Sequence, residues 1–450
     1  MNRTVNFHEL SKLTKMQRQR LLQRTETDLS GYESRVRDII NAVRSEGDEA
    51  LARFARDFDK SPVKASALAA TDEDFARAEK RLEPKVREAM EFAAESIRRF
   101  HNDQMPEEMW LHEIRPGAFA GDRTRPIPSA ACYVPRGKGA FPSVALMTAI
   151  PARVAGVKDL IIITPPGPDG NIDDATLVAA RMAGVSKVFK AGGAQGIAAV
   201  AYGTATVPKV SKVVGPGSPW VAEAKRQVSH VIDTGTPAGP SELIILADDT
   251  IDGRLAALDL LIESEHGPDS SAYLVTWSRR VAEEALAAIP EFWANMSEQR
   301  AGFSATVLSG PIGGIVLARD EDEAIAFTND YAAEHLEVLA KEPFQYLGRL
   351  EHAGEILLGE HTPTTLGNFV LGPSHVLPTS GWARTASAIS VFDFMKRTSI
   401  AYVTSKGYPE LANHARTLAT YEGFDGHANA VSEVRDSILK PSPKTERGNP

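Results

Sequence analysis

The 450 residues include 50 Lys and Arg against 59 Asp and Glu, for a formal charge of -9, with 43% hydrophobic and 24% charged residues. Such values are typical of a globular chain of several domains. The acidic balance argues against nucleic acid as the main partner, because that binding needs a basic surface. The single cysteine, Cys132, excludes an internal disulfide and a cysteine-based zinc finger. A bound metal would therefore need histidine and oxygen ligands.

The first half of the chain predicts a helical opening followed by an α/β domain. Residues 1–28 begin with a basic, acid-poor stretch, which we interpret as a docking arm in preference to a transit peptide. Apolar residues recur at spacings of three and four over 32–59 and 72–101, which predicts amphipathic helices. From residue 130, short aliphatic runs alternate with helical segments, so parallel βαβ units are expected over 130–242. The expected strands there are 160–163, 187–189 and 210–214, and the expected helices are 174–183 and 195–202.

A second α/β domain is predicted from the same rhythm in the second half. Its expected strands are 243–246, 272–276, 315–317, 336–339 and 356–358, and its expected helices are 252–265 and about 320–331. We assign it residues 243–388 together with the N-terminal helices in 29–129. Residues 389–435 read as a helical dimerisation segment and 436–450 as a disordered tail. No stretch approaches the roughly 18 to 20 apolar residues of a membrane helix, so the protein is expected in the cytoplasm and away from membranes.

Histidines beside carboxylates mark the candidate chemistry, because no GxGxxG dinucleotide fingerprint follows a predicted strand. Glu263 and His266 are spaced i, i+3 at the end of an apolar helix and could hold one ion, although a solvated helix end is the commoner meaning of such a pair. Glu334 and His335 read as a loop that enters a strand and presents one group to a cleft, or as ordinary surface charge. His375 and His427 could equally be turn, capping or packing histidines.

Ordered sequence blocks from about residue 30 to 435 resemble the histidinol dehydrogenase family. The blocks include Tyr133-Val134-Pro135, Gly192-Gly193-Ala194-Gln195, Gly215-Pro216-Gly217, Ala238-Gly239-Pro240-Ser241-Glu242, Glu334-His335-Leu336 and His375-Val376-Leu377-Pro378-Thr379. The resemblance, with the βαβ rhythm, implies an α/β protein with two Rossmann-like parallel-sheet domains, a helical N-terminal arm and a helical C-terminal swapped segment.

The resemblance also implies a reaction, namely NAD-dependent oxidation of a primary alcohol through an aldehyde to the carboxylate, as from L-histidinol to L-histidine. In this reaction His335 would take the hydroxyl proton and Glu334 would help activate water on the aldehyde. One Zn²⁺ per subunit would be held by Glu263, His266, Asn368 and His427.

The remaining expectations from the family concern assembly and binding. A homodimer with swapped segments is implied, in which the C-terminal segment of one subunit completes the site of the other, so that His427 acts in trans. The small-molecule substrate would contact Ser241, His375 and Glu422, and NAD would contact Tyr133, Gln195 and Ser218.

Several positions depart from the family pattern. Glu263 stands where the family has glutamine and Asn368 where it has aspartate, so the formal charge around zinc is kept while its position changes; this favours a retained site with a different substrate fit. Arg136, beside Lys138, replaces a small residue and is a surface side chain, a contact of the NAD pyrophosphate, or a ligand of an anionic substrate. Ser218 replaces asparagine and Ala333 proline. The alternatives are therefore the same chemistry on an anionic alcohol such as a sulfonated diol, or a non-catalytic zinc-binding homologue.

Overall fold

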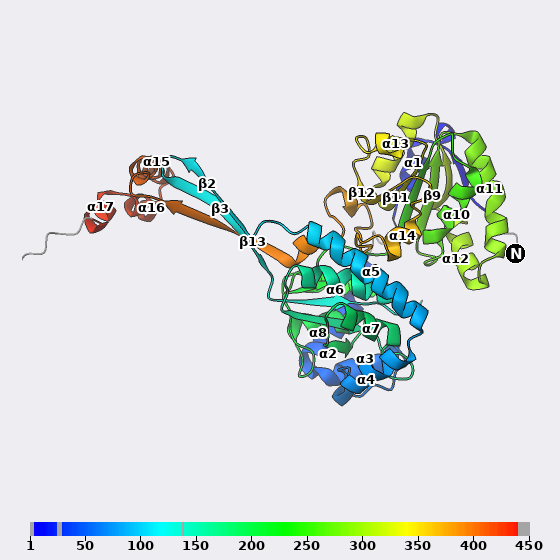
Figure 1. The fold of residues 1–450 in the computed structure, drawn as a ribbon, viewed down its shortest axis with the longest axis horizontal. Coiled ribbons are helices and arrows are strands. Elements are labelled where there is room, and N and C mark those ends of the chain that lie inside the picture. Colours follow the sequence, from blue (N-terminus) through cyan, green and yellow to red (C-terminus); the bar gives the residue numbers. More distant parts are fainter. Residues whose placement is uncertain (1–3, 25–28, 137–138, 440–450) are drawn as a thin grey trace, which may run out of the picture. The chain divides into compact units, whose positions relative to one another are not determined.

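The computed structural model describes residues 4–24, 29–136 and 139–439, which form two compact units (Figure 1). The larger unit comprises the chain up to residue 105 and residues 126–394, and the smaller unit comprises residues 106–125 and the chain from 395 onward. Two parallel sheets flanked by helices make up the larger unit, which confirms the predicted α/β class. Among the described residues, no helix has both the length and the apolar character needed to cross a membrane.

A six-stranded parallel sheet organises the first α/β domain. Its strands are β1 (Phe7–Glu9), β8 (Glu242–Ala247), β9 (Ser271–Thr276), β10 (Gly313–Leu317), β11 (Ala333–Leu339) and β12 (Ala353–Leu358), in the order β1-β10-β9-β8-β11-β12. From β8 the chain builds outward to β10 and then returns to place β11 on the other side of β8. The direction of winding therefore reverses between β8 and β11, as in doubly wound folds.

Helices cover both faces of this sheet, which is why its strands are apolar throughout. Leu243 and Ile245 of β8 pack into the core beneath α10 (Gly253–Ser264), α11 (Arg279–Ala294) and α12 (Glu298–Ser309). Ile244 and Leu246, which point the other way, pack into the core beneath α13 (Glu321–Tyr331). The N-terminal arm belongs to this domain, because β1 pairs with β10 and Leu21 at the end of α1 (Lys15–Leu21) is buried in the second core.

A four-stranded parallel sheet organises the second α/β domain. Its strands are β4 (Ser129–Tyr133), β5 (Asp159–Thr164), β6 (Val188–Lys190) and β7 (Lys212–Val214), in the order β6-β5-β4-β7. Its helices are α6 (Pro142–Val154), α7 (Asp174–Met182), α8 (Gly193–Tyr202) and α9 (Pro219–Val228). Here too the winding reverses beside the first strand, between β4 and β7.

The N-terminal helices pack on this four-stranded domain, so assigning 29–129 to the domain of residues 243–388 was wrong. The helices are α2 (Ser30–Glu46), α3 (Asp48–Phe58), α4 (Asp72–Arg81) and α5 (Pro84–Asp103). Ile40 and Leu51 share one core with Ile161 and Ile197 of the second domain, while α4 and α5 contact α7 and α6. An apolar helix stripe predicts burial without specifying which sheet the helix will cover.

The smaller unit combines a three-stranded sheet with short helices. β2 (Met109–Arg115) and β3 (Ala118–Pro126) are antiparallel, and β13 (Met395–Val403) pairs with β3. Helices α15 (Tyr408–Tyr421), α16 (Asp425–Ala430) and α17 (Glu433–Leu439) follow. The expectation of helix throughout 389–435 was wrong at β13, whose largely exposed residues gave no alternating apolar signal. Residues 436–439 of the predicted tail are helical, and 440–450 lie outside the described residues.

Candidate active site

Glu334 and His335 lie near the start of β11, beside the winding reversal of the six-stranded sheet. The preceding Ala332 has the left-handed φ of 54° and ends α13, and its N–H donates to the Thr328 carbonyl at 3.1 Å. This turn directs the chain from the helix straight into β11. Both candidate side chains are buried, so they are neither surface charge nor part of a loop. The prediction that the chain enters a strand at these two residues is close to the structure, in which both lie near the start of β11.

The Glu334 carboxylate is held by backbone and lies beside the imidazole. The Glu242 N–H donates to Glu334 Oε2 at 2.9 Å, and this same oxygen lies 3.9 Å from His335 Nε2. Burial raises the pKa of Glu334 well above its ordinary value; the charge of His335 opposes this shift and that of Glu263 adds to it. A carboxyl group in such surroundings can hold and release a proton at neutral pH.

His335 is oriented by a carboxylate that the sequence reading missed. Its Nδ1 lies 3.1 Å from Glu355 Oε2, and Glu355 is its register partner on β12. Burial alone would lower the pKa of His335, but the Glu334 charge, the hydrogen bond with Glu355 and the Glu263 charge outweigh it and raise the pKa to about 9. Because Nδ1 is engaged, Nε2 is the nitrogen turned toward Glu334. The available signal was a lone carboxylate within an apolar strand pattern.

Three of the four predicted metal ligands lie together at the end of α10. Glu263 Oε2 is 3.1 Å from His266 Nδ1, and Asn368 Nδ2 donates to Glu263 Oε1 at 2.6 Å. Asn368 is carried by α14 (Thr364–Phe369). Burial would raise the pKa of Glu263, but the charges of the nearby histidines and hydrogen bonds from Asn368 and Ser241 lower it overall. Glu263 is thus a buried carboxylate beside nitrogen and amide donors, a set that suits Zn²⁺.

The proposed set of metal ligands in the larger unit needs the amide of Asn368 in addition to Glu263 and His266. Among residues 4–24, 29–136 and 139–439, no cluster of three or more His, Cys, Asp or Glu side chains is arranged to hold a metal ion. The fourth predicted ligand, His427, belongs to α16 of the smaller unit, where its ring packs 5.2 Å from that of Phe424. Glu422, a predicted substrate contact, follows α15 in the same unit and is exposed. The larger unit therefore supplies three of the predicted ligands.

Two predicted substrate residues join this group. Ser241 immediately precedes β8 and hydrogen-bonds to Glu263. His375 is enclosed, and burial, with the charge of His335, lowers its pKa to about 4. Its Nδ1 has no hydrogen-bond partner among the described residues. A neutral imidazole with an unused nitrogen is suited to bind a polar substrate group.

A buried carboxyl pair braces the elements that carry these residues. Asp259, one turn before Glu263 on α10, hydrogen-bonds to Glu337, two residues after His335 on β11. Thr364, at the start of α14, donates its N–H and hydroxyl to Glu337 Oε2 at 3.1 and 3.0 Å. Burial raises the pKa of both carboxyls, so the pair retains a proton. The elements bearing Glu263, His335 and Asn368 are thereby tied together behind the site.

The predicted cofactor residues gather on the four-stranded sheet. Tyr133 ends β4, and its hydroxyl accepts from the Gly193 N–H at 3.2 Å. Gln195 and Ser218, which follow β6 and β7, line a cavity of about 390 Å³. Gly193 has φ 57°, a conformation that glycine adopts readily. These residues lie at or just beyond the carboxyl ends of β4, β6 and β7, the side of a doubly wound sheet where ligands bind.

Arg136 also lies on this second domain. Its Nη1 donates to the Asn171 carbonyl at 3.2 Å, and it lines a cavity of about 530 Å³ with Asp59 and Pro165. Burial raises the pKa of Asp59 to about 6, opposed by the Arg136 charge. The structure therefore associates Arg136 with the candidate cofactor residues, whereas Lys138 lies outside the described residues.

Comparisons with known proteins identify the family of this chain. Residues 22–435 match the family model described as histidinol dehydrogenase. The chain belongs to the histidinol dehydrogenase family. A histidinol dehydrogenase homolog of Rhizobium meliloti (strain 1021) is 61% identical over 437 residues, covering 97% of this chain and 96% of the relative. A histidinol dehydrogenase of Synechocystis sp. is 47% identical over 431 residues, covering 96% and 99%.

A solved structure extends the agreement to three dimensions. The crystal structure of histidinol dehydrogenase from Elizabethkingia anophelis superposes with a TM-score of 0.90 at 28% identity, over 97% of this chain and 99% of that one. The resemblance predicted from the sequence blocks is confirmed. As a family member, the chain is an oxidoreductase of the type that takes an alcohol to an acid.

Proposed function

We propose that this family member catalyses the NAD-dependent, zinc-assisted oxidation of a primary alcohol through an aldehyde to the carboxylate. The observation that carries the proposal is the buried His335, held by Glu355 on one nitrogen and facing Glu334 with the other. An imidazole oriented by a carboxylate is suited to accept a proton from a hydroxyl.

In the first step, His335 acts as the base. Its Nε2 takes the hydroxyl proton while the carbon-bound hydride passes to NAD⁺, so the alcohol becomes an aldehyde and one NADH forms. The Glu355 carboxylate stabilises the imidazolium that results, because it faces Nδ1 at 3.1 Å. Orientation and charge compensation therefore come from one neighbouring strand.

In the second step, Glu334 acts on water. Its carboxylate takes a proton from a water molecule as that water adds to the aldehyde, and the hydrate then loses a hydride to a second NAD⁺ and becomes the carboxylate. Burial raises the pKa of Glu334, which makes its carboxylate a stronger proton acceptor than one in water. One alcohol molecule would yield two NADH.

The metal would be held by Glu263, His266 and Asn368, with His427 of a second copy of the chain as the fourth ligand. When bound, zinc would supply a Lewis acid that positions and polarises the substrate oxygen. Support for a homodimer comes from the smaller unit, where all seven residues of β2 are exposed. Apolar side chains exposed there include Trp110, Ile114, Tyr421, Phe424 and Ile438. Large apolar side chains left exposed in this number favour a surface that a partner covers.

The cofactor would be held on the four-stranded domain by Gln195 and Ser218, which line one cavity, and by Tyr133, whose hydroxyl accepts from the N–H of Gly193 in the lining of that cavity. Of the three interpretations of Arg136, its cavity beside Asp59 favours contact with the NAD pyrophosphate. We place the enzyme in the cytoplasm, as befits a family of metabolic enzymes.

L-Histidinol is the first substrate to test. The exchanged residues Glu263 and Asn368 favour comparison with an anionic alcohol such as a sulfonated diol. Relatives that are 61% and 56% identical, each named histidinol dehydrogenase homolog, favour the same comparison, since the relative named histidinol dehydrogenase is 47% identical. We expect NADH from one of these alcohols in a 2:1 ratio to substrate consumed, measured at 340 nm. NADH absent with every alcohol in the presence of Zn²⁺ would leave the non-catalytic zinc-binding alternative.

A further inference from the structure

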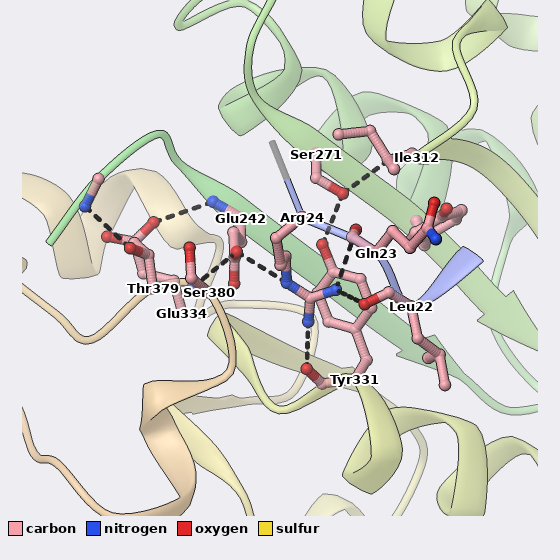
Figure 2. Close-up of polar contacts among 12 residues, drawn as sticks. Leu22, Gln23, Arg24, Glu242, Ser271, Ile312, Tyr331, Glu334, Thr379 and Ser380 are labelled. Carbon is pink, nitrogen blue, oxygen red and sulfur yellow. Dashed lines mark hydrogen bonds and ion pairs between the residues drawn. The ribbon is translucent and has the colours of Figure 1, made fainter. Parts of the chain in front are cut away.

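A buried ion pair connects the N-terminal arm to the first α/β domain. Arg24 Nε lies 2.8 Å from Glu242 Oε1, and the two side chains are only 6% and 4% exposed. Figure 2 shows the guanidinium of Arg24 enclosed among Glu242, Tyr331 and the arm backbone. Buried ion pairs contribute little net stability, because removing both charges from water is costly. The position of this pair suggests a different benefit.

Glu242 is in direct contact with both the arm and the catalytic carboxylate. Its carboxylate faces Arg24, while its backbone N–H donates to Glu334 Oε2 at 2.9 Å (Figure 2). Arg24 also donates to the Tyr331 carbonyl, and its Cζ lies 3.4 Å from the centre of the Tyr331 ring. Tyr331 is three residues before Glu334. The arm therefore contacts both the partner of Glu334 and the backbone that leads to it.

The same pair borders two backbone positions in an unfavourable conformation. Three non-glycine residues have positive φ in the described chain, namely Lys60 at 55°, Ala332 at 54° and Ser380 at 57°. Ala332 follows the carbonyl that Arg24 binds, and the Ser380 N–H donates to Glu242 Oε1 at 2.8 Å. Strained conformations persist where the surroundings hold them in place. Arg24 and Glu242 do so on the segment before Glu334 and on the loop that follows His375.

We propose that Arg24 is a positioning residue for Glu334. By fixing Glu242 and the Tyr331 carbonyl, it holds the Glu334 carboxylate where water must be activated, so the docked arm is required for the second oxidation step. The proposal rests on the proposed role of Glu334 in that step. His335 is oriented independently by Glu355, so the first step depends less on the arm.

The matched variants are Arg24→Gln and Arg18→Gln. Arg18 anchors the same arm, since it binds Glu323 Oε1 at 2.7 Å and the Leu10 carbonyl, and in the part of the chain that the structure describes it forms no hydrogen bond or ion pair with Glu242 or Glu334. Because Arg24→Gln leaves the buried Glu242 carboxyl without its cationic partner, Arg24→Gln/Glu242→Gln is made as well, which removes both members of the ion pair and keeps the Glu242 N–H. Folding of each variant is checked by its thermal unfolding midpoint.

Two measurements are made on each variant. One is NADH formation from L-histidinal compared with the first NADH formed from L-histidinol in a single turnover. We expect Arg24→Gln and the double variant to lower the rate from the aldehyde by at least about tenfold and the rate from the alcohol by less than about threefold, because small displacements of catalytic groups have large effects. Arg18→Gln should lower the unfolding midpoint and leave the ratio of the two rates unchanged. Equal losses in both steps, or a wild-type ratio in both Arg24 variants, would overturn the proposal.

The second readout does not need activity. Hydrogen exchange should be faster in peptides containing Glu242 and Ser380 in Arg24→Gln, and unchanged there in Arg18→Gln. If these imidazole substrates give no NADH with the wild type, faster exchange confined to the Arg24 variants supports the positioning proposal while the proposed substrate fails. Unchanged exchange in the Arg24 variants overturns the positioning proposal whatever the substrate.

Discussion

The two parallel sheets of the larger unit share a winding pattern but present their candidate functional residues at opposite ends of their strands. In the four-stranded sheet, Tyr133 ends β4, and Gln195 and Ser218 follow the carboxyl ends of β6 and β7. In the six-stranded sheet, Glu334 and His335 lie near the amino end of β11. The first arrangement obeys the general rule for open α/β sheets, and the second departs from it.

The difference follows from what each edge offers. The carboxyl edge of the smaller sheet presents helix N-termini and glycine turns, which suit the phosphates of a dinucleotide. The amino edge of the larger sheet presents strand starts and the end of α10, so acids and histidines from β8, β11, β12 and α10 converge there. We call the carboxyl side of the four-stranded sheet the cofactor edge and the amino side of the six-stranded sheet the chemistry edge. The following variants test that division.

The largest expected effect is on the chemistry edge. His335→Asn removes the proposed base, and we expect kcat to fall about 10²- to 10⁴-fold, the usual contribution of general base catalysis. The dissociation constant of NADH, measured by fluorescence titration, should stay within about twofold because the polar partners of His335 are Glu334 and Glu355 and not the candidate cofactor residues. A large change in NADH affinity with kcat retained would contradict the division between the edges.

Glu355→Gln should have the next largest effect, because it removes the carboxylate that faces His335 Nδ1. Losing such a partner typically costs about 10- to 100-fold in activity. His335 must be neutral to act, so wild-type activity should rise with pH toward its pKa of about 9. Removing Glu355 removes an influence that raises this pKa, and the rising limb should therefore move to lower pH. A pH profile of kcat that is unshifted would show that Glu355 does not tune the imidazole.

On the cofactor edge, Gly193→Ala should weaken NAD binding. Gly193 has φ 57°, and an added Cβ would lie 2.8 Å from Gln195 Oε1. A left-handed alanine costs roughly 1–2 kcal/mol, so the dissociation constant for NADH should rise about 5- to 30-fold with a small change in kcat. Gly31→Ala is the control, because a Cβ there meets nothing within 4 Å and φ is ordinary. Equal NADH affinity in the two variants would argue against Gly193 at the cofactor.

The smallest effect is expected from the buried carboxyl pair of Asp259 and Glu337, which lies behind the chemistry edge. The pKa of Asp259 in the folded protein is raised above its unfolded value, so the stability from this protonated pair is present at low pH and is lost as pH rises through the raised pKa. Asp259→Asn provides a donor to Glu337 that does not titrate. Its unfolding free energy should differ from the wild type by about 1 kcal/mol or less at low pH. The thermal midpoint should also fall less than that of the wild type between about pH 5 and pH 8, and an equal fall would exclude this pair as the source.

The sequence by itself determined the family and the α/β class, and it supplied most of the candidate site residues as predictions. Alternating aliphatic and helical segments predicted both parallel sheets, since buried strands and amphipathic helices have different periods. The acids and histidines were recognisable because the family blocks contain them. The helix that presents Glu263 was anticipated from local pattern, and so was the strand at residues 336–339, but His335 was expected in the loop before that strand and lies within it.

Only the tertiary structure decided which parts meet. It placed α2 to α5 on the four-stranded sheet, because the apolar stripe of a helix does not specify which sheet the helix will cover. It also formed β13 by pairing with a strand far away in the sequence. It also brought Glu355 to His335, Asp259 to Glu337 and Arg24 to Glu242 across long sequence separations. Such contacts depend on strand register and burial, and these are properties of the folded chain that no local stretch of sequence contains.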